Sequence, residues 1–156
     1  MDDIDRDIVR LLQQDGRLSN QDLADAIRLS PSPTLRRVRR LEEDGVIAGY
    51  TALVDQRAWG LPVTCFVQIR LSEHNRAAVE AFEQAVQQVD RIQECFLMTG
   101  EADYLLRVVA ADLEDYEDFV RSTLHQMPGI ASIGTGFAYG VVKRTPALPV
   151  PRPQAR

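Results

Sequence analysis

The chain has 156 residues, a net charge of −5 and 45% hydrophobic residues, which are values of an ordinary soluble globular protein. No apolar run reaches the roughly 18 residues that a membrane span needs, and the acidic start MDDIDRD lacks the apolar region of a signal peptide. The two distant cysteines, Cys65 and Cys95, give neither a disulfide framework nor a metal-ligand spacing. The composition therefore predicts a cytoplasmic protein of one large or two small domains, without a metal site.

Residues 3–45 have the pattern of three short helices joined by tight turns. In the first helix, apolar residues recur at helical spacing until Gly16, which is a stop signal. The second helix begins at Ser19, and Asp22 follows at the spacing of a capping box. Only the three residues RLS separate the second helix from the third. This arrangement predicts a helix-turn-helix.

The third helix lies in LSPSPTLRRVRRLEEDG, residues 29–45, and is expected to run to about Asp44. Its two prolines fit the first helical turn, where amide donors have no partner. Either Ser30 or Ser32 can be the N-cap, and the sequence does not decide between them. At 100° per residue, an apolar stripe is predicted at Leu35, Val38 and Leu41. Arg36 and Arg40 point away from this stripe. Arg37 and Arg39 flank the polar face on either side.

Five arginines and no acidic residue lie between Arg28 and Arg40. A solvated helix face is the simplest explanation of such a run. A helix that reads DNA, however, needs a small polar first turn near the phosphates and arginines one turn deeper in the groove. Arginine also matches the edges of guanine and the phosphate group. We therefore interpret this helix as a reader of double-stranded DNA, with contacts from Ser30, Ser32, Arg36, Arg37 and Arg40.

After the third helix, residues 46–54 suggest a small wing or an outgoing strand, and residues 55–62 read as a linker. From residue 63 the pattern becomes β-α-β-β-α-β. The predicted strands are 63–71, 92–99, 104–111 and 130–142, and the predicted helices are 75–89 and 113–127. This is an α+β, ferredoxin-like arrangement, with two helices on one face of an antiparallel sheet. The predicted domains are 1–54 and 63–145, followed by a proline-rich, extended or mobile tail at 146–156.

The chain resembles the Lrp/AsnC family of bacterial and archaeal transcriptional regulators. The resemblance lies in DDIDRDIVRLLQQDGRLSNQDLA, LSPSPTLRRVRRLEEDGVIAGYTALVD and ECFLMTGEADYLLRV. It implies a helix-turn-helix reader followed by a domain that senses amino acids and dimerises through its sheet, often within octameric discs. It therefore implies a DNA-binding regulator that is not an enzyme and needs no cofactor apart from an amino-acid effector. Many relatives carry Cys where this chain has Thr34.

The resemblance also places the effector in a cleft between subunits, beside the hairpin TGEADYLLRV. There, the carboxylate of Asp103 can accept a hydrogen bond from an ammonium group, and the backbone around Gly100 can meet a carboxylate. The implied effector residues are Thr99, Gly100, Asp103, Tyr104, Thr135, Gly136, Phe137 and Ala138. The isolated His74 and His125 are expected to be surface or packing residues.

Two functions other than that of a regulator also fit parts of the sequence. In the first, the ferredoxin-like domain is a small-molecule enzyme or binding module, and the helices are an appendage. Arginines clustered on one helix argue against it, because an appendage does not need them. In the second, the protein organises DNA and responds little to an effector, and the sequence leaves this open.

Overall fold

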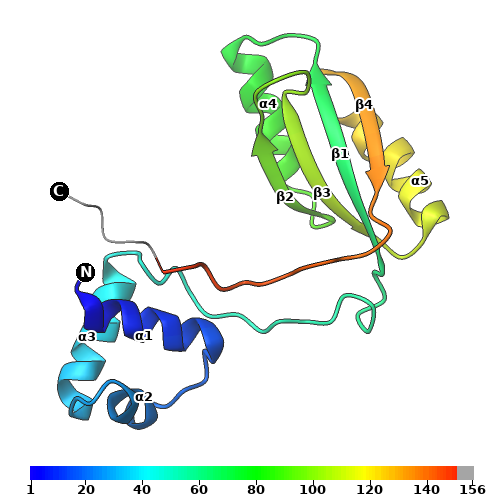
Figure 1. The fold of residues 1–156 in the computed structure, drawn as a ribbon. Helices are drawn as coiled ribbons and strands as arrows, with labels where there is room; N and C mark the ends of the chain where they lie inside the picture. The colour runs from blue at the N-terminus through cyan, green and yellow to red at the C-terminus, as the bar shows by residue number, and fades with distance from the viewer. Residues whose placement is uncertain (151–156) are drawn as a thin grey trace. The chain divides into compact units, whose positions relative to one another are not determined.

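A computed structural model describes residues 1–150 of the chain, so the part 151–156 of the predicted tail 146–156 lies outside the described residues. The chain divides into two compact units (Figure 1). One consists of Met1–Leu53 together with a segment that begins at Val142, and the other is Val54–Val141. The segment from Val142 thus belongs with the helical unit, although the sequence suggested a separate tail.

The helical unit contains α1 (Asp3–Gln14), α2 (Asn20–Ala26) and α3 (Pro31–Glu43). A capping box begins α1, and the Ser19 side chain caps α2 by accepting a hydrogen bond from the Asp22 amide. The core of the unit is formed by one side chain from each helix: Ile8, Leu23 and Leu41, all at most 2% exposed. These three side chains pack α3 against the other two helices. The resulting arrangement is the predicted helix-turn-helix.

Three local predictions for this unit need correction or completion. The buried face of α3 is Thr34, Val38 and Leu41, whereas Leu35 is 39% exposed, so the predicted stripe is rotated by one residue. Thr34 can be buried because its hydroxyl donates to the Ser30 carbonyl at 3.0 Å. Ser30, not Ser32, is the N-cap residue. Residues 46–62 contain no strand, so of the two alternatives after α3, a small wing or an outgoing strand, the strand is not formed.

The second unit is an antiparallel four-stranded sheet with the order β2-β3-β1-β4. This topology confirms the predicted ferredoxin-like α+β fold. Its elements are β1 (Val63–Leu71), α4 (Arg76–Gln87), β2 (Ile92–Leu97), β3 (Tyr104–Ala110), α5 (Leu113–Ser122), the short 3₁₀ helix η1 (Leu124–Gln126) and β4 (Ile130–Phe137).

Two of these elements are shorter than predicted. The helix at 113–127 ends at Ser122 and continues as η1, and Leu113 is exposed because it stands at the first position of α5. The strand at 130–142 ends at Phe137. Phe137 is the last residue of β4 paired with β1, opposite Cys65.

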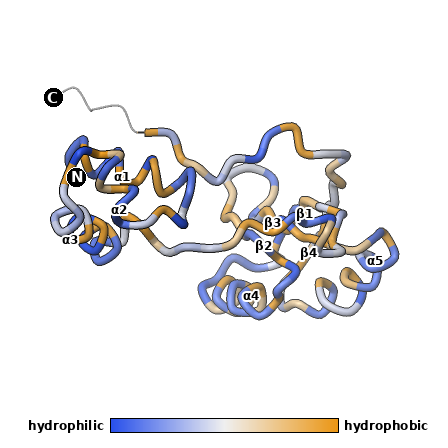
Figure 2. The backbone as a smooth tube through the Cα atoms, turned by 90° about the horizontal axis from the view of Figure 1, so that it is seen from below, coloured by the Kyte–Doolittle hydropathy of each residue, from blue (hydrophilic) through white to orange (hydrophobic). Residues whose placement is uncertain are grey.

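The two helices α4 and α5 lie on the same side of the sheet (Figure 2). Alternate residues of β1 and β3 point to them and are buried with Phe82 of α4 and Phe119 of α5. The other face of the sheet is open. It carries Phe66 and Phe96, which are 42% and 48% exposed. An open sheet face with such aromatic residues is a surface that a second protein can cover.

Candidate DNA-binding and effector-binding sites

The outer face of α3 is polar and carries two arginines without partners. At 100° per residue, the positions opposite the buried face are Ser32, Arg36 and Arg39, and all three are exposed. Within residues 1–150, neither Arg36 nor Arg39 makes a side-chain hydrogen bond or an ion pair. Their guanidinium groups are therefore available to an external anion.

The other two arginines of α3 are held by the start of α1. Arg37 Nη1 lies 2.7 Å from Asp5 Oδ1 and 2.8 Å from Asp2 Oδ2. Arg40 Nη2 lies 2.6 Å from Asp5 Oδ2. Arg40 was predicted to point away from the apolar stripe; its side chain is 51% exposed but is anchored at one end by Asp5.

The charges in this cluster stabilise one another. The Asp5 amide and the Arg37 guanidinium lower the pKa of the Asp2 carboxyl group below its usual value. In turn, the carboxylates of Asp5 and Asp2 raise the pKa of Arg37. At neutral pH, Arg37 and Asp2 are thus both ionised, as charge-assisted hydrogen bonds require.

The first turn of α3 offers hydroxyl groups and few amides. Pro31 and Pro33 have no N–H, and the Ser30 side chain makes no capping hydrogen bond. The Asn20 side-chain amide donates to the Pro31 carbonyl at 2.9 Å and fixes this turn to α2. The polar donors left at the helix start are the hydroxyls of Ser30 and Ser32, together with the Ser32 amide.

In the sheet unit, the Asp103 carboxylate is held by the end of β1 and the loop that follows it. Oδ2 accepts the Leu71 amide at 2.7 Å, and Oδ1 lies 3.0 Å from His74 Nε2. The Leu71 amide and then the His74 side chain lower the pKa of Asp103. A carboxylate has about four acceptor sites, so Asp103, 25% exposed, keeps capacity for a further donor. His74, expected to be a surface or packing residue, contacts Asp103.

The predicted effector residues form two groups: the hairpin residues lie at one end of the sheet, and the β4 residues run from its middle, where Thr135 pairs with Val67, to its other end. The Asp103 amide bonds to the Ile69 carbonyl, while the Ala138 amide bonds to the Thr64 carbonyl. Five residues of β1 at about 3.3 Å each separate these points by roughly 16 Å. The hairpin group is Thr99, Gly100 and Asp103, and the β4 group is Thr135, Gly136, Phe137 and Ala138. The structure of one protomer does not bring the two groups together.

Tyr104, the remaining predicted effector residue, faces the helices and not the open side. It is 2% exposed, its ring lies 4.7 Å from that of Phe82, and its hydroxyl donates to Glu83 at 2.8 Å. Burial raises the pKa of Tyr104 to about 12. Tyr104 therefore supports the hairpin from the helix side of the sheet.

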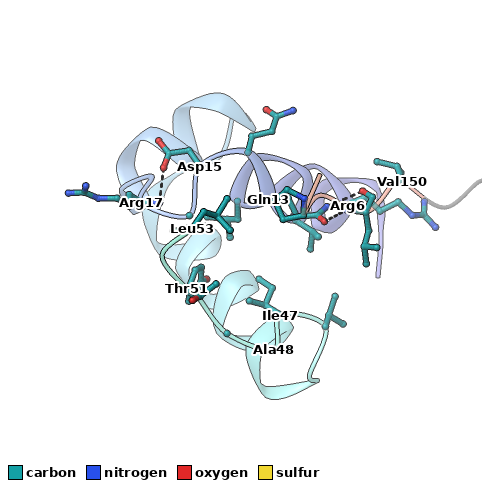
Figure 3. Close-up of a pocket in the computed structure, with 18 of the residues that line it drawn as sticks. Arg6, Gln13, Asp15, Arg17, Ile47, Ala48, Thr51, Leu53 and Val150 are labelled. Carbon is teal, nitrogen blue, oxygen red and sulfur yellow. Dashed lines mark hydrogen bonds between the residues drawn. The ribbon is translucent and has the colours of Figure 1, made fainter. Parts of the chain in front are cut away.

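The helical unit also contains a groove of about 1020 Å³ between α1, residues 46–53 and residues 146–150 (Figure 3). Gln13 of α1 crosses it, accepting the Leu148 amide at 2.6 Å and donating to the Leu148 carbonyl at 3.3 Å. None of the predicted site residues lines the groove. Leu148 and its neighbours, from the chain that follows β4, form one side of the groove.

Asp2, Asp5 and Arg39, on or beside α3, and His74 at the hairpin were not among the predicted site residues. The signal for Asp5 was available, because Asp2 and Asp5 have the spacing of a capping box. The ion pairs with α3 had no such signal, since they join residues 32–35 positions apart.

No helix within residues 1–150 has the length and apolar character to cross a membrane.

Comparisons with known proteins cover both units. Residues 64–148 match the family model of the Lrp/AsnC ligand binding domain, and residues 1–48 match a winged helix-turn-helix DNA-binding model. The chain is 43% identical to the Bkd operon transcriptional regulator of Pseudomonas aeruginosa over 150 residues, 96% of this chain and 98% of that protein. It is 42% identical to the leucine-responsive regulatory protein of Escherichia coli over 151 residues, 95% and 90% of the two chains.

Solved structures agree with these relatives. A transcriptional regulator of Neisseria meningitidis, in a complex with L-Met, has a TM-score of 0.91 at 34% identity over 96% of each chain. An AsnC family transcriptional regulator from Agrobacterium tumefaciens also has a TM-score of 0.91, at 38% identity, and the match covers 96% of this chain and 97% of that one.

Proposed function

We propose which residues bind DNA and which bind the effector in this chain, which belongs to the Lrp/AsnC family of transcriptional regulators and is therefore a DNA-binding regulator with an amino-acid ligand-binding domain. The proposal has two parts: α3 reads DNA through its outer face, and two copies of the sheet unit together bind one amino acid. The cytoplasm, where the DNA is, is the proposed place of action.

For DNA, the proposed contacts are Ser30, Ser32, Arg36, Arg37 and Arg40, with Arg39 added. The observation that carries this set is the pair of unpartnered, exposed guanidinium groups of Arg36 and Arg39 on the face opposite the core. A base contact of arginine is worth about 1–3 kcal/mol. The hydroxyls of the first turn are suited to the phosphates on either side.

The test is a titration of wild type and Arg36→Ala with a duplex selected from a random pool, at several salt concentrations. Arg36→Ala should bind the selected duplex about tenfold more weakly. Arg121→Ala is the matched control, because Arg121 is an exposed arginine on α5 that pairs only with Glu117 at i,i+4. Equal affinities of Arg36→Ala and Arg121→Ala would refute the assignment of α3.

For the effector, we propose a site that is completed by a second copy of the chain. Two observations support this: the two groups of effector residues are separated along one sheet, and the open face carries Phe66 and Phe96. A twofold pairing of open faces covers these aromatic side chains and brings the hairpin of one copy toward β4 of the other. The family's amino-acid ligand then meets Asp103 through its ammonium group and the backbone near Gly100 through its carboxylate.

Two measurements separate the parts of this proposal. Sedimentation equilibrium should give at least twice the chain mass for wild type, and Phe66→Glu should lower it, because a carboxylate on the open face opposes pairing. A thermal-shift screen with the twenty amino acids should raise the melting temperature with at least one, by mass action. Asp103→Ala should abolish that shift, whereas Asp90→Ala, at an exposed acid far from the hairpin, should keep it. A screen in which none of the twenty binds would favour a DNA-organising protein.

A further inference from the structure

We infer that Asp5 is a positioning residue of the DNA-binding surface, and that its buried carboxylate fixes Arg37 and Arg40 of α3 so that the protein distinguishes its target from other DNA. The inference rests on the proposed role of α3. It adds a residue of α1 that touches no DNA in this arrangement and acts through the two arginines.

Asp5 is the centre of a cluster that joins α1 to α3. Its side chain is 1% exposed, and it accepts three hydrogen bonds. The donors are Arg37 Nη1 at 2.7 Å, Arg40 Nη2 at 2.6 Å and the Asp2 amide at 2.9 Å. Both carboxylate oxygens are therefore occupied, and two of the bonds reach a helix more than thirty residues away in the sequence.

Capping of α1 alone does not account for this arrangement. A capping box needs one bond from the third helical residue back to the cap amide, and Asp5 makes that bond to Asp2. An exposed side chain could make it as well. The burial of an ionised group is unfavourable unless it is paired and hydrogen-bonded. Here, the pairing partners are two of the four arginines of α3, Arg37 and Arg40, so the buried carboxylate serves their orientation.

The two arginines are held to different degrees. Arg37, 25% exposed, bridges Asp5 and Asp2, so its guanidinium is the more restrained of the two. Arg40 is 51% exposed and uses one nitrogen for Asp5. A guanidinium has five N–H donors in a rigid fork. Arg40 can therefore present its remaining donors to a phosphate or a base in one fixed direction.

The charges of the cluster also affect binding to DNA of any sequence. Two carboxylates and two guanidinium groups leave no net charge at this part of α3. Non-specific binding depends on the number of phosphates neutralised, with a salt slope of about 0.9 per phosphate. Asp2 and Asp5 therefore reduce attraction to any phosphate backbone, while the oriented donors of Arg40 remain available at short range.

The test compares Asp5→Asn with Asp7→Asn. Both remove one negative charge from α1, but Asp7 is exposed and pairs with Arg10 on the same helix. Each variant is titrated with the selected duplex and with a scrambled duplex, and folding is checked by circular dichroism. Asp5→Asn should lower the ratio of specific to non-specific affinity about tenfold. Its affinity for the scrambled duplex should be unchanged or higher, because Arg37 and Arg40 are released.

The outcomes are distinguishable. Partial loss of folded protein lowers both affinities in proportion and leaves their ratio unchanged, and circular dichroism identifies it. For a folded Asp5→Asn, an unchanged ratio overturns the inference. So does a ratio equal to that of Asp7→Asn. If Asp5→Asn does not fold, Asp2→Asn takes its place, since Asp2 is exposed and holds Arg37. A lower ratio than that of Asp7→Asn supports the cluster, and an equal ratio overturns it. Should Arg36→Ala weaken binding while Asp5→Asn behaves as Asp7→Asn, only this inference fails, not the role of α3.

Discussion

Arg28 stands where a helix of this kind ends best with glycine. The Arg28 amide bonds to the Asp25 carbonyl at 3.2 Å, and the Leu29 amide bonds to the Ala24 carbonyl at 2.9 Å. These are the two hydrogen bonds of a Schellman motif at the end of α2, with Arg28 at the left-handed position. Its φ is 58°, the one positive φ of a non-glycine residue within residues 1–150. We therefore predict that Arg28→Gly stabilises the helical unit.

The magnitude follows from two opposing effects. A residue with a Cβ in the left-handed region costs about 1–2 kcal/mol, and glycine removes this cost. Glycine, however, loses more conformational entropy on folding, which costs about 0.5–1 kcal/mol. The expected net gain is about 0.5–1 kcal/mol. For a domain of this size, it corresponds to roughly 3–6 °C in the melting temperature.

The assay is calorimetry of Arg28→Gly, Arg28→Asn and Arg28→Ala beside wild type. All three variants lose the same charge, so electrostatic effects cancel among them. Glycine should be the most stable and alanine the least, with asparagine between, because asparagine tolerates the left-handed region. If Arg28→Ala is as stable as Arg28→Gly, α2 does not end in the left-handed turn and the reasoning is refuted.

Three further predictions concern the groove, the hairpin and the free thiols. Gln13→Ala should lower the stability of the helical unit by about 1 kcal/mol, since it removes two hydrogen bonds to Leu148; Gln14→Ala, at the neighbouring exposed glutamine, provides the control in denaturant unfolding. The folded state lowers the pKa of Asp103 below 3.8, so its contribution to stability is fully present above pH 3.8 and is lost as the pH falls below that value; the difference between wild type and Asp103→Asn in urea unfolding should therefore shrink only in that acidic range. Burial raises the pKa of Cys65 to about 11, so a thiol reagent at pH 8 should label exposed Cys95 first, and Cys65 only on unfolding.

The element order could be predicted from the sequence because each period is strong. The strand at 63–71 has the predicted bounds, since its alternating pattern matches a sheet with one face on the helices and one face open. The buried face of α3 could not be predicted in the same way. By hydrophobicity, Leu35 is a better core residue than Thr34, yet the packing of α1 and α2 selects Thr34, whose hydroxyl is satisfied within its own helix turn.

The site was less predictable than the fold, because it depends on contacts between distant parts of the chain. Arginines at helical spacing indicate a recognition helix, but spacing alone does not distinguish Arg36 from Arg40. The acidic start of α1 makes that distinction by binding one of them and leaving the other free. Likewise, the hairpin motif points to Asp103, but only the register of β1 with its neighbours shows that one protomer holds the two effector groups apart.

The net charge of −5 and the arginine-rich helix are compatible because they act over different distances. Exposed charges are screened beyond about 8–10 Å in physiological salt, so a distant acidic surface has little effect on a phosphate in contact with α3.

Acidic residues within the cluster act differently, because they pair with Arg37 and Arg40 directly. Pairing cancels the attraction to any phosphate but keeps the direction of the remaining N–H donors. For a regulator that must find one site among many, the ratio of specific to non-specific affinity is the relevant quantity. Acidic residues beside the arginines of a recognition helix raise that ratio because they lower the non-specific affinity.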